Sequence, residues 1–131
     1  FLIGLVTLIS YRPFPVDQLR DALAEAEHIV VVEKSVSVGM GGPLANDIDL
    51  ALRNMAHPPR PHSAVAGLGG RPITKNSLAD LFRQSLVQPW EGTHFLDLNE
   101  RIVARNIHRS RKVRRSGPIA ENLIRQMATE N

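Results

Sequence analysis

Cysteine is absent from the 131 residues of this sequence. Disulfide bonds and thiolate metal sites are therefore excluded, and so is ligation of an iron–sulfur cluster by this chain. The five histidines include no pair spaced to share one helix face as metal ligands. No apolar run approaches the roughly 20 residues that a membrane-spanning helix needs. We therefore expect a globular domain without a metal site of its own.

The two ends of the chain differ in charge. Residues 1–99 contain 8 basic and 10 acidic side chains, a net charge of −2, whereas residues 100–131 contain 8 basic and 3 acidic ones, a net charge of +5. Five of the seven residues from 109 to 115 are basic, so this stretch offers little apolar surface to bury. We expect residues 97–131 to form a basic helical arm, with helices at about 98–107 and after Pro118. This arm packs on a partner or frays without one.

Three apolar runs have the length of β-strands, and each is followed by a loop and then by an amphipathic run. Strands are predicted at 3–10, 29–32 and 63–66, with a short added strand at 94–96, and helices at about 16–27, 43–56 and 75–87. Repeated strand-loop-helix units are typical of α/β domains, so we expect a three-layer α/β/α domain with a mainly parallel sheet over residues 1–96. The run Ile29–Val32 is apolar throughout, which predicts a strand inside the sheet.

The loops after the three strands should gather at one edge, because the carboxyl ends of parallel strands point the same way. These loops cover residues 11–15, 33–43 and 67–74. The candidate site residues on them are Arg12, Phe14, Glu33, Gly41, Gly42, Gly69, Gly70 and Arg71. An arginine in such a loop can bind a carboxylate or a phosphate through two nitrogens, and a salt bridge within or between chains is the alternative to a ligand contact.

Glu33 ends the most apolar strand at the edge where a carboxylate would act on a substrate. No second carboxylate, histidine or lysine stands at a recognisable spacing to exchange a proton with it, so a hydrogen bond to the next loop is the alternative role. Ser35 and Ser37 lack the Gly-x-Ser-x-Gly pattern of a hydrolase nucleophile. We therefore assign no catalytic residue from the pattern alone.

The two glycine-rich loops could cradle a phosphate, since free N–H groups and the dipole of the following helix would both face the anion. Neither loop contains a Gly-Lys-Ser/Thr ending or a spaced Gly-x-Gly-x-x-Gly, and Pro43 has no N–H to offer. Tight packing between strand and helix is the alternative reason for the glycines. In that case replacing Gly69 or Gly70 by a residue with a Cβ is expected to destabilise the fold.

Five motifs in order resemble the transketolase C-terminal-like domain of the pyruvate:ferredoxin oxidoreductase alpha subunit. They are Tyr11-Arg12-Pro13-Phe14-Pro15, Val16-Asp17-Gln18-Leu19, Val31-Val32-Glu33-Lys34, Gly41-Gly42-Pro43-Leu44 and Ala66-Gly67-Leu68-Gly69-Gly70-Arg71. The resemblance covers roughly residues 5–88. It implies that the chain, which begins within an apolar run and without methionine, is a domain fragment of a longer subunit.

The resemblance implies a complex that decarboxylates pyruvate on thiamine diphosphate with Mg²⁺, passes electrons through [4Fe-4S] clusters to ferredoxin or flavodoxin, and forms acetyl-CoA from coenzyme A. In that family the cofactors are held by other domains, so no cofactor is expected in this chain. This domain would then be a non-catalytic member of the complex that forms domain and subunit contacts and has no activity alone. The loop at 39–43 favours the pyruvate branch over the 2-oxoglutarate branch. A cytoplasmic enzyme is expected.

Two alternatives remain open. The chain could be an independent α/β module whose basic arm docks an acidic partner or nucleic acid, although the arm has no aromatic side chain on which a base could stack. It could also be an enzyme that binds a phosphate-bearing ligand in its glycine loops, although those loops lack the expected lysine and Ser/Thr.

Overall fold

The computed structural model describes residues 3–112, and of residues 110–112 it describes the backbone alone. Residues 1–97 form one compact unit, and the second unit begins at Leu98. The expected helix after Pro118 and residues 113–115 of the basic run lie outside the described residues. No helix in the described part of the chain is long and apolar enough to cross a membrane.

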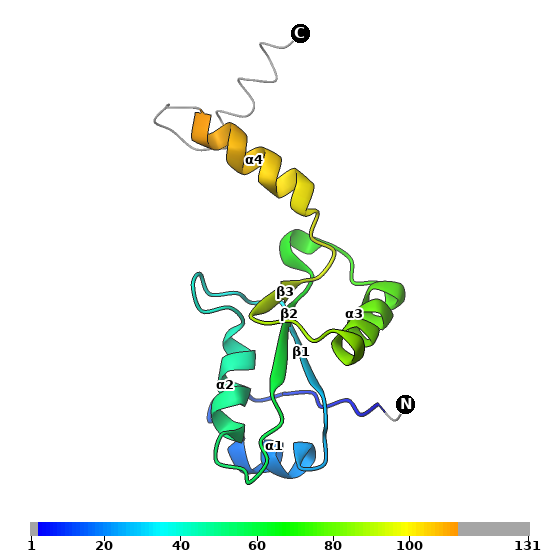
Figure 1. Ribbon diagram of the computed structural model, residues 1–131. Helices are drawn as coiled ribbons and strands as arrows, with labels where there is room; N and C mark the ends of the chain where they lie inside the picture. Colours follow the sequence, from blue (N-terminus) through cyan, green and yellow to red (C-terminus); the bar gives the residue numbers. More distant parts are fainter. Residues whose placement is uncertain (1–2, 113–131) are drawn as a thin grey trace. The chain divides into compact units, whose positions relative to one another are not determined.

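The first unit is built on a parallel sheet of three strands, in the order β1 (Ile29–Glu33), β2 (Pro61–Val65) and β3 (Thr93–Phe95). In register, Ile29 faces Pro61 and Ser63 faces Thr93. The helices of this unit are α1 (Val16–Leu23), α2 (Pro43–Leu52) and α3 (Lys75–Val87), with a 3-10 turn η1 (Leu68–Gly70). Figure 1 shows α2 on one side of the sheet and α3 on the other. The predicted α/β class with a parallel sheet is confirmed.

Local sequence explains where two helices begin. Pro43 is the first residue of α2, a position where its fixed φ suits the helix and its missing N–H costs nothing. Thr74 precedes α3, and its hydroxyl accepts a hydrogen bond from the Ser77 N–H at 3.1 Å. The third predicted helix is therefore observed with its predicted bounds, 75–87.

The core lies where α1 and α2 pack on β1 and β2. Its buried members are Leu19, Ile29, Val31, Ala45, Ile48 and Leu52. Phe14 and Leu8 are half-buried at the margin of this cluster. Leu52 is 1% exposed, and full burial of such a side chain stabilises a fold by about 1.5–3 kcal/mol. The buried face of α2 contributes Ala45, Ile48 and Leu52 to this core.

Two expectations about strands are wrong. Residues 3–10 form no strand, and within them only Leu8 reaches the core, while Leu5 is 91% and Ile9 98% exposed. Strand β1 is not internal but lies at the edge of the described sheet, since β2 and β3 both lie to the same side of it. An apolar run indicates that a strand is favourable, but whether the strand forms, and which strands pair with it, depends on residues far away in the sequence.

Helix ends also differ from the expectation. Helix α1 ends at Leu23 and α2 at Leu52, whereas the predictions extended both by four residues. The second strand begins at Pro61, a position that proline tolerates because the first residue of a strand can do without a ladder donor. The short added strand is present as β3, one residue earlier than expected.

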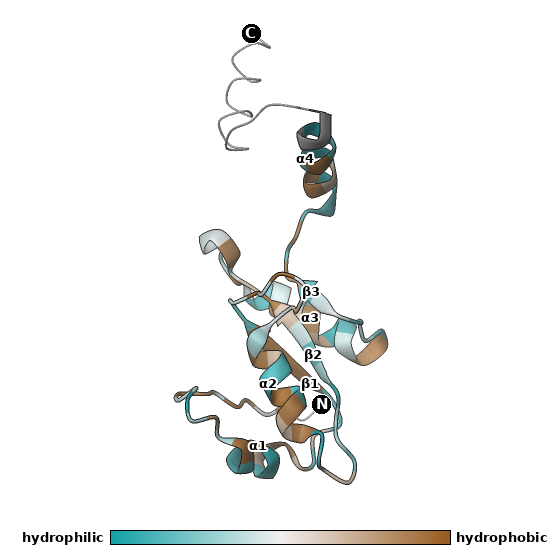
Figure 2. Cartoon of the chain, turned by 90° about the vertical axis from the view of Figure 1, so that its left-hand side faces the viewer, coloured by the Kyte–Doolittle hydropathy of each residue, from teal (hydrophilic) through white to brown (hydrophobic). Residues whose placement is uncertain are grey.

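The second unit contains α4 (Glu100–Lys112) among its described residues. Asn99 stands before the helix, and its side-chain oxygen accepts from the Ile102 N–H at 3.1 Å. Apolar and basic side chains both occur along α4, as the mixed brown and teal bands in Figure 2 show. The helix is thus amphipathic, with a basic polar face.

Candidate functional site

The carboxyl ends of β1 and β2 carry the loops at 33–43 and 67–74, and here lie most of the candidate residues. The loop at 11–15 does not belong to this edge, because no strand precedes it and its polar contacts go to Asp47 on α2. The expectation that three loops share one edge is therefore wrong for the first of them.

Glu33 binds the amino end of α2. One carboxylate oxygen accepts from the Leu44 N–H and the other from the Ala45 N–H, each at 3.0 Å. These are two of the N–H groups that a helix start leaves without partners, and a negative charge there is favoured by the helix dipole. The carboxylate thus joins the end of β1 to α2 as a helix cap, the role expected as the alternative to substrate chemistry.

Gly41 and Gly42 allow the loop before α2 to lie directly on the strand ends. A Cβ on Gly42 would overlap the Glu33 carboxylate and come within 2.9 Å of the buried Ser63 hydroxyl. A Cβ on Gly41, whose φ is +79°, would overlap the Thr93 hydroxyl. The pair is therefore needed for close backbone approach, which is the packing reason that the sequence left open.

Arg12 binds within the chain. Its guanidinium donates to the Asp47 carboxylate at 3.0 Å and lies 4.0 Å above the centre of the Tyr11 ring. Tyr11 in turn donates its hydroxyl to the same Asp47 oxygen at 2.6 Å and meets the Phe14 ring edge-on at 5.9 Å. The loop at 11–15 is thus attached to α2 by one aspartate, and the salt bridge expected as the alternative to a ligand contact is present.

The same contacts perturb the ionisation of this cluster. The hydrogen bonds from Tyr11 and then from Arg12 hold the pKa of Asp47 below its ordinary value, against partial desolvation. The bond to Asp47 raises the pKa of the Tyr11 hydroxyl, since ionised tyrosine could not donate it. The pKa of Arg12 is raised by the same carboxylate. All three shifts favour the paired state at neutral pH.

Arg71 donates to the backbone carbonyl of Asp97. It follows η1, where Gly69 and Gly70 have φ of +65° and +78° and no neighbouring atom near the position of a Cβ. These glycines are therefore needed for their backbone conformation rather than for space.

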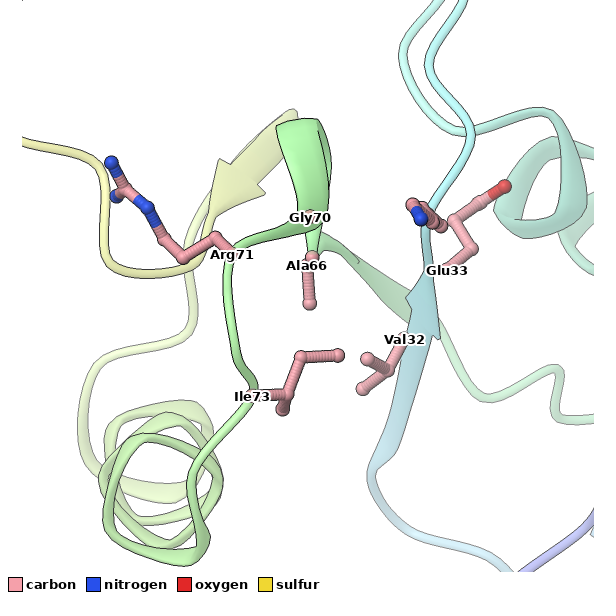
Figure 3. Close-up of a pocket in the computed structure, with 8 residues that line it drawn as sticks. Val32, Glu33, Ala66, Gly70, Arg71 and Ile73 are labelled. Atoms are coloured by element: carbon pink, nitrogen blue, oxygen red, sulfur yellow. The ribbon is translucent and has the colours of Figure 1, made fainter.

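A shallow hollow of about 390 Å³ lies between the end of β1 and the loop after β2. Figure 3 shows Val32, Ala66 and Ile73 pointing toward one another across it, whereas Glu33 points to the other side of β1, toward α2, and Arg71 points away. The side chains that face one another across the hollow are thus apolar, and its charged lining residues are Glu33, Lys34 and Arg71. Among the described residues, no group of three or more histidine or acidic side chains could hold a metal ion.

Sequence reasoning missed Asp47, which receives both Tyr11 and Arg12 from 35 or more positions away. Nothing local marks this aspartate in the body of a helix. Sequence reasoning also missed Val38 and Met40, whose side chains are exposed to solvent. A signal for these two was available, because no charged residue occurs between Lys34 and Asp47.

Residues 1–78 match the family model described as pyruvate:ferredoxin oxidoreductase core domain II. The chain is 35% identical over 78 residues to pyruvate synthase subunit PorA of Pyrococcus abyssi, covering 60% of this chain and 20% of that protein. It is 33% identical over 86 residues to PorA of Thermotoga maritima, covering 66% and 22%. Ketoisovalerate oxidoreductase subunit VorA of Pyrococcus furiosus is 30% identical over 74 residues, covering 56% and 19%. The chain thus spans about a fifth of the length of these relatives. No solved structure matches it.

Proposed function

We propose that this chain, which belongs to the pyruvate:ferredoxin oxidoreductase core domain II family, serves as a non-catalytic structural domain at an interface of a 2-oxoacid:ferredoxin oxidoreductase. One observation carries the proposal: Glu33, Arg12 and Arg71, the charged candidates, each bind another part of the same chain. Side chains held in this way shape the loops and are not poised for proton transfer. The domain is therefore expected to provide a rigid surface that other parts of the enzyme contact.

Pyruvate is the proposed substrate of the assembled enzyme, which would form acetyl-CoA and CO2 in the cytoplasm and reduce ferredoxin or flavodoxin. The Gly41-Gly42-Pro43 loop supports this choice, as do the names of the PorA relatives. The match to VorA shows that this domain is similar in relatives named for another 2-oxoacid. Substrate choice is therefore assigned to the parts of the enzyme beyond this domain.

Thiamine diphosphate, Mg²⁺, [4Fe-4S] clusters and coenzyme A belong, in this proposal, to other parts of the complex. The clusters do not fit this chain because it has no cysteine. A diphosphate does not fit the amino end of α2, because the Glu33 carboxylate already occupies the N–H groups of Leu44 and Ala45 and would repel another anion.

Titration calorimetry of the 131-residue chain with thiamine diphosphate and Mg²⁺ tests the non-catalytic role. We expect no heat of binding, and no oxidation of pyruvate by the chain alone. Micromolar binding would contradict the proposal. In parallel, the purified subunits of the oxidoreductase should bind the chain and give pyruvate-dependent reduction of ferredoxin only when it is present.

We propose further that α4 contacts an acidic surface of the assembled enzyme or of its electron acceptor. Arg101, Arg105 and Arg109 recur every four residues and so follow one face, while Ile102 and Val103 are 46% and 38% exposed. A basic face beside an exposed apolar one is the pattern of a helix that binds a partner. Nucleic acid is the weaker candidate, because no aromatic side chain is present in the arm for base stacking.

A further inference from the structure

The loop between β1 and α2 exposes two large apolar side chains. Val38 is fully exposed, and Met40 is 72% exposed. They flank Gly39, whose φ is +81°. We call the segment Ser37–Gly41 the Val38–Met40 turn. In Figure 1 this loop, in cyan, projects beyond the sheet between β1 and α2.

The turn is held in one conformation by its own backbone. The Ser37 N–H donates to the Gly41 carbonyl at 2.7 Å, and the Met40 and Gly41 N–H groups donate to the Ser37 carbonyl at 3.0 and 2.9 Å. From outside the turn, the Asn46 side chain donates to the Met40 carbonyl at 2.9 Å. Gly41 also rests against Thr93 of β3. Val38 and Met40 are thus presented on a bonded frame anchored to α2 and β3, so binding would order little more than two side chains.

The sequence on both sides of the turn is also uncharged. No acidic or basic residue occurs from Ser35 to Asn46, and Val36 is 38% exposed. The centres of protein–protein interfaces are depleted of charge and enriched in methionine. The chemistry of the turn therefore fits an apolar pocket on another protein surface.

We infer that the Val38–Met40 turn is an anchor that inserts into an apolar pocket on another part of the same oxidoreductase. The inference rests on the proposed interface function. Relatives are about five times as long as the matched region, so a large protein surface accompanies this domain in those enzymes. Two side chains are too few to hold a homodimer, which needs roughly 1,000 Å² or more of buried surface, but they suffice as one anchor of a larger interface.

The test uses the 131-residue chain and the rest of its oxidoreductase, including the remainder of the subunit that holds this domain, purified without the chain, with the apparent Kd measured in a concentration series. The variant is Val38→Ser with Met40→Ser. The matched control is Leu50→Ser with Val87→Ser, which removes apolar side chains that are 61% and 86% exposed on α2 and α3. We expect the turn variant to weaken binding about tenfold or more, and the control to bind like the wild type. Val38→Ile with Met40→Leu should retain binding.

We expect thermal melting to give the same midpoint for the turn variant and the wild type, because neither Val38 nor Met40 contributes to the core. Equal affinity of the turn variant and the wild type overturns the inference while leaving the interface function standing. The inference is also overturned if the wild-type chain associates with itself and the turn variant does not. The turn would then bind a second copy of this chain. Failure of the wild-type chain to bind the subunits at all contradicts both this inference and the proposed function.

Discussion

The α/β unit and α4 differ in where their charged and apolar side chains lie and in what these side chains contact. In the α/β unit the charged residues of the candidate site bind within the chain, and the apolar faces of its helices meet a buried cluster. In α4 every side chain from Glu100 to Arg109 is exposed, and within the described residues no ion pair joins Arg101, Arg105 or Arg109. The first region is stabilised by its own contacts, whereas a helix of 13 residues is only marginally stable in water by itself. Function by contact is therefore expected of the helix whose charged and apolar side chains are exposed together.

Truncating one apolar side chain in each region gives the largest expected difference. Leu52→Ala removes a side chain that is 1% exposed and should lower the free energy of unfolding by about 2–5 kcal/mol. Ile102→Ala, at 46% exposed, should change it by less than about 0.5 kcal/mol. Urea unfolding of the chain measures both. A comparable loss for the two variants would show that α4 is part of the same cooperative unit.

Removal of the helix cap should have the next largest effect. Glu33→Ala deletes the acceptor of two backbone N–H groups and a favourable charge at the start of α2, so we expect a loss of about 2–3 kcal/mol in the free energy of unfolding. Glu27→Ala, an exposed acid before β1, is the matched control and should be close to neutral. If the two changes cost the same, the carboxylate is not what joins β1 to α2.

A smaller effect is expected from the titration of Asp47. Because its pKa is lower in the folded state, its contribution to stability is present above the unfolded value, about 3.8, and is lost as the pH falls through the folded value. Wild type should therefore lose more stability between pH 5 and pH 3 than Asp47→Asn. Asp21→Asn, which removes an exposed acid from α1, is the control and should follow the wild type. Denaturant midpoints at each pH provide the measurement, and parallel curves for wild type and Asp47→Asn would contradict the role of this cluster.

The smallest effect on stability is expected from removing the basic charges of α4. The free energy of unfolding should stay the same, and only the rate of association with the electron acceptor should change. With Arg101, Arg105 and Arg109 all replaced by serine, reduction of ferredoxin by the assembled enzyme should slow by about tenfold at low ionic strength and converge with wild type at high salt. The control replaces Arg60, Lys75 and Arg83, three exposed basic residues of the α/β unit. Identical rates and salt dependence in the triple variant and the wild type would rule out contact with the electron acceptor.

Residues close in sequence made much of this molecule predictable. The apolar run at 29–32, the proline that begins α2 and the threonine that precedes α3 each act within a few residues, and the corresponding strand and helix starts were found where expected. The parallel arrangement also followed, because alternating strands and helices leave few other solutions. The glycine loops pointed to close packing, which Gly41 and Gly42 show.

What the sequence by itself determined is therefore local: the order of the elements, the caps and the loops that need glycine. The tertiary structure decided which elements meet. The edge position of β1, the absence of a strand at 3–10 and the binding of Arg12 and Tyr11 to Asp47 all depend on residues far apart in the chain. Propensity and periodicity act over one or two turns of chain, whereas strand pairing and side-chain partners are selected by the free energy of the whole packed domain.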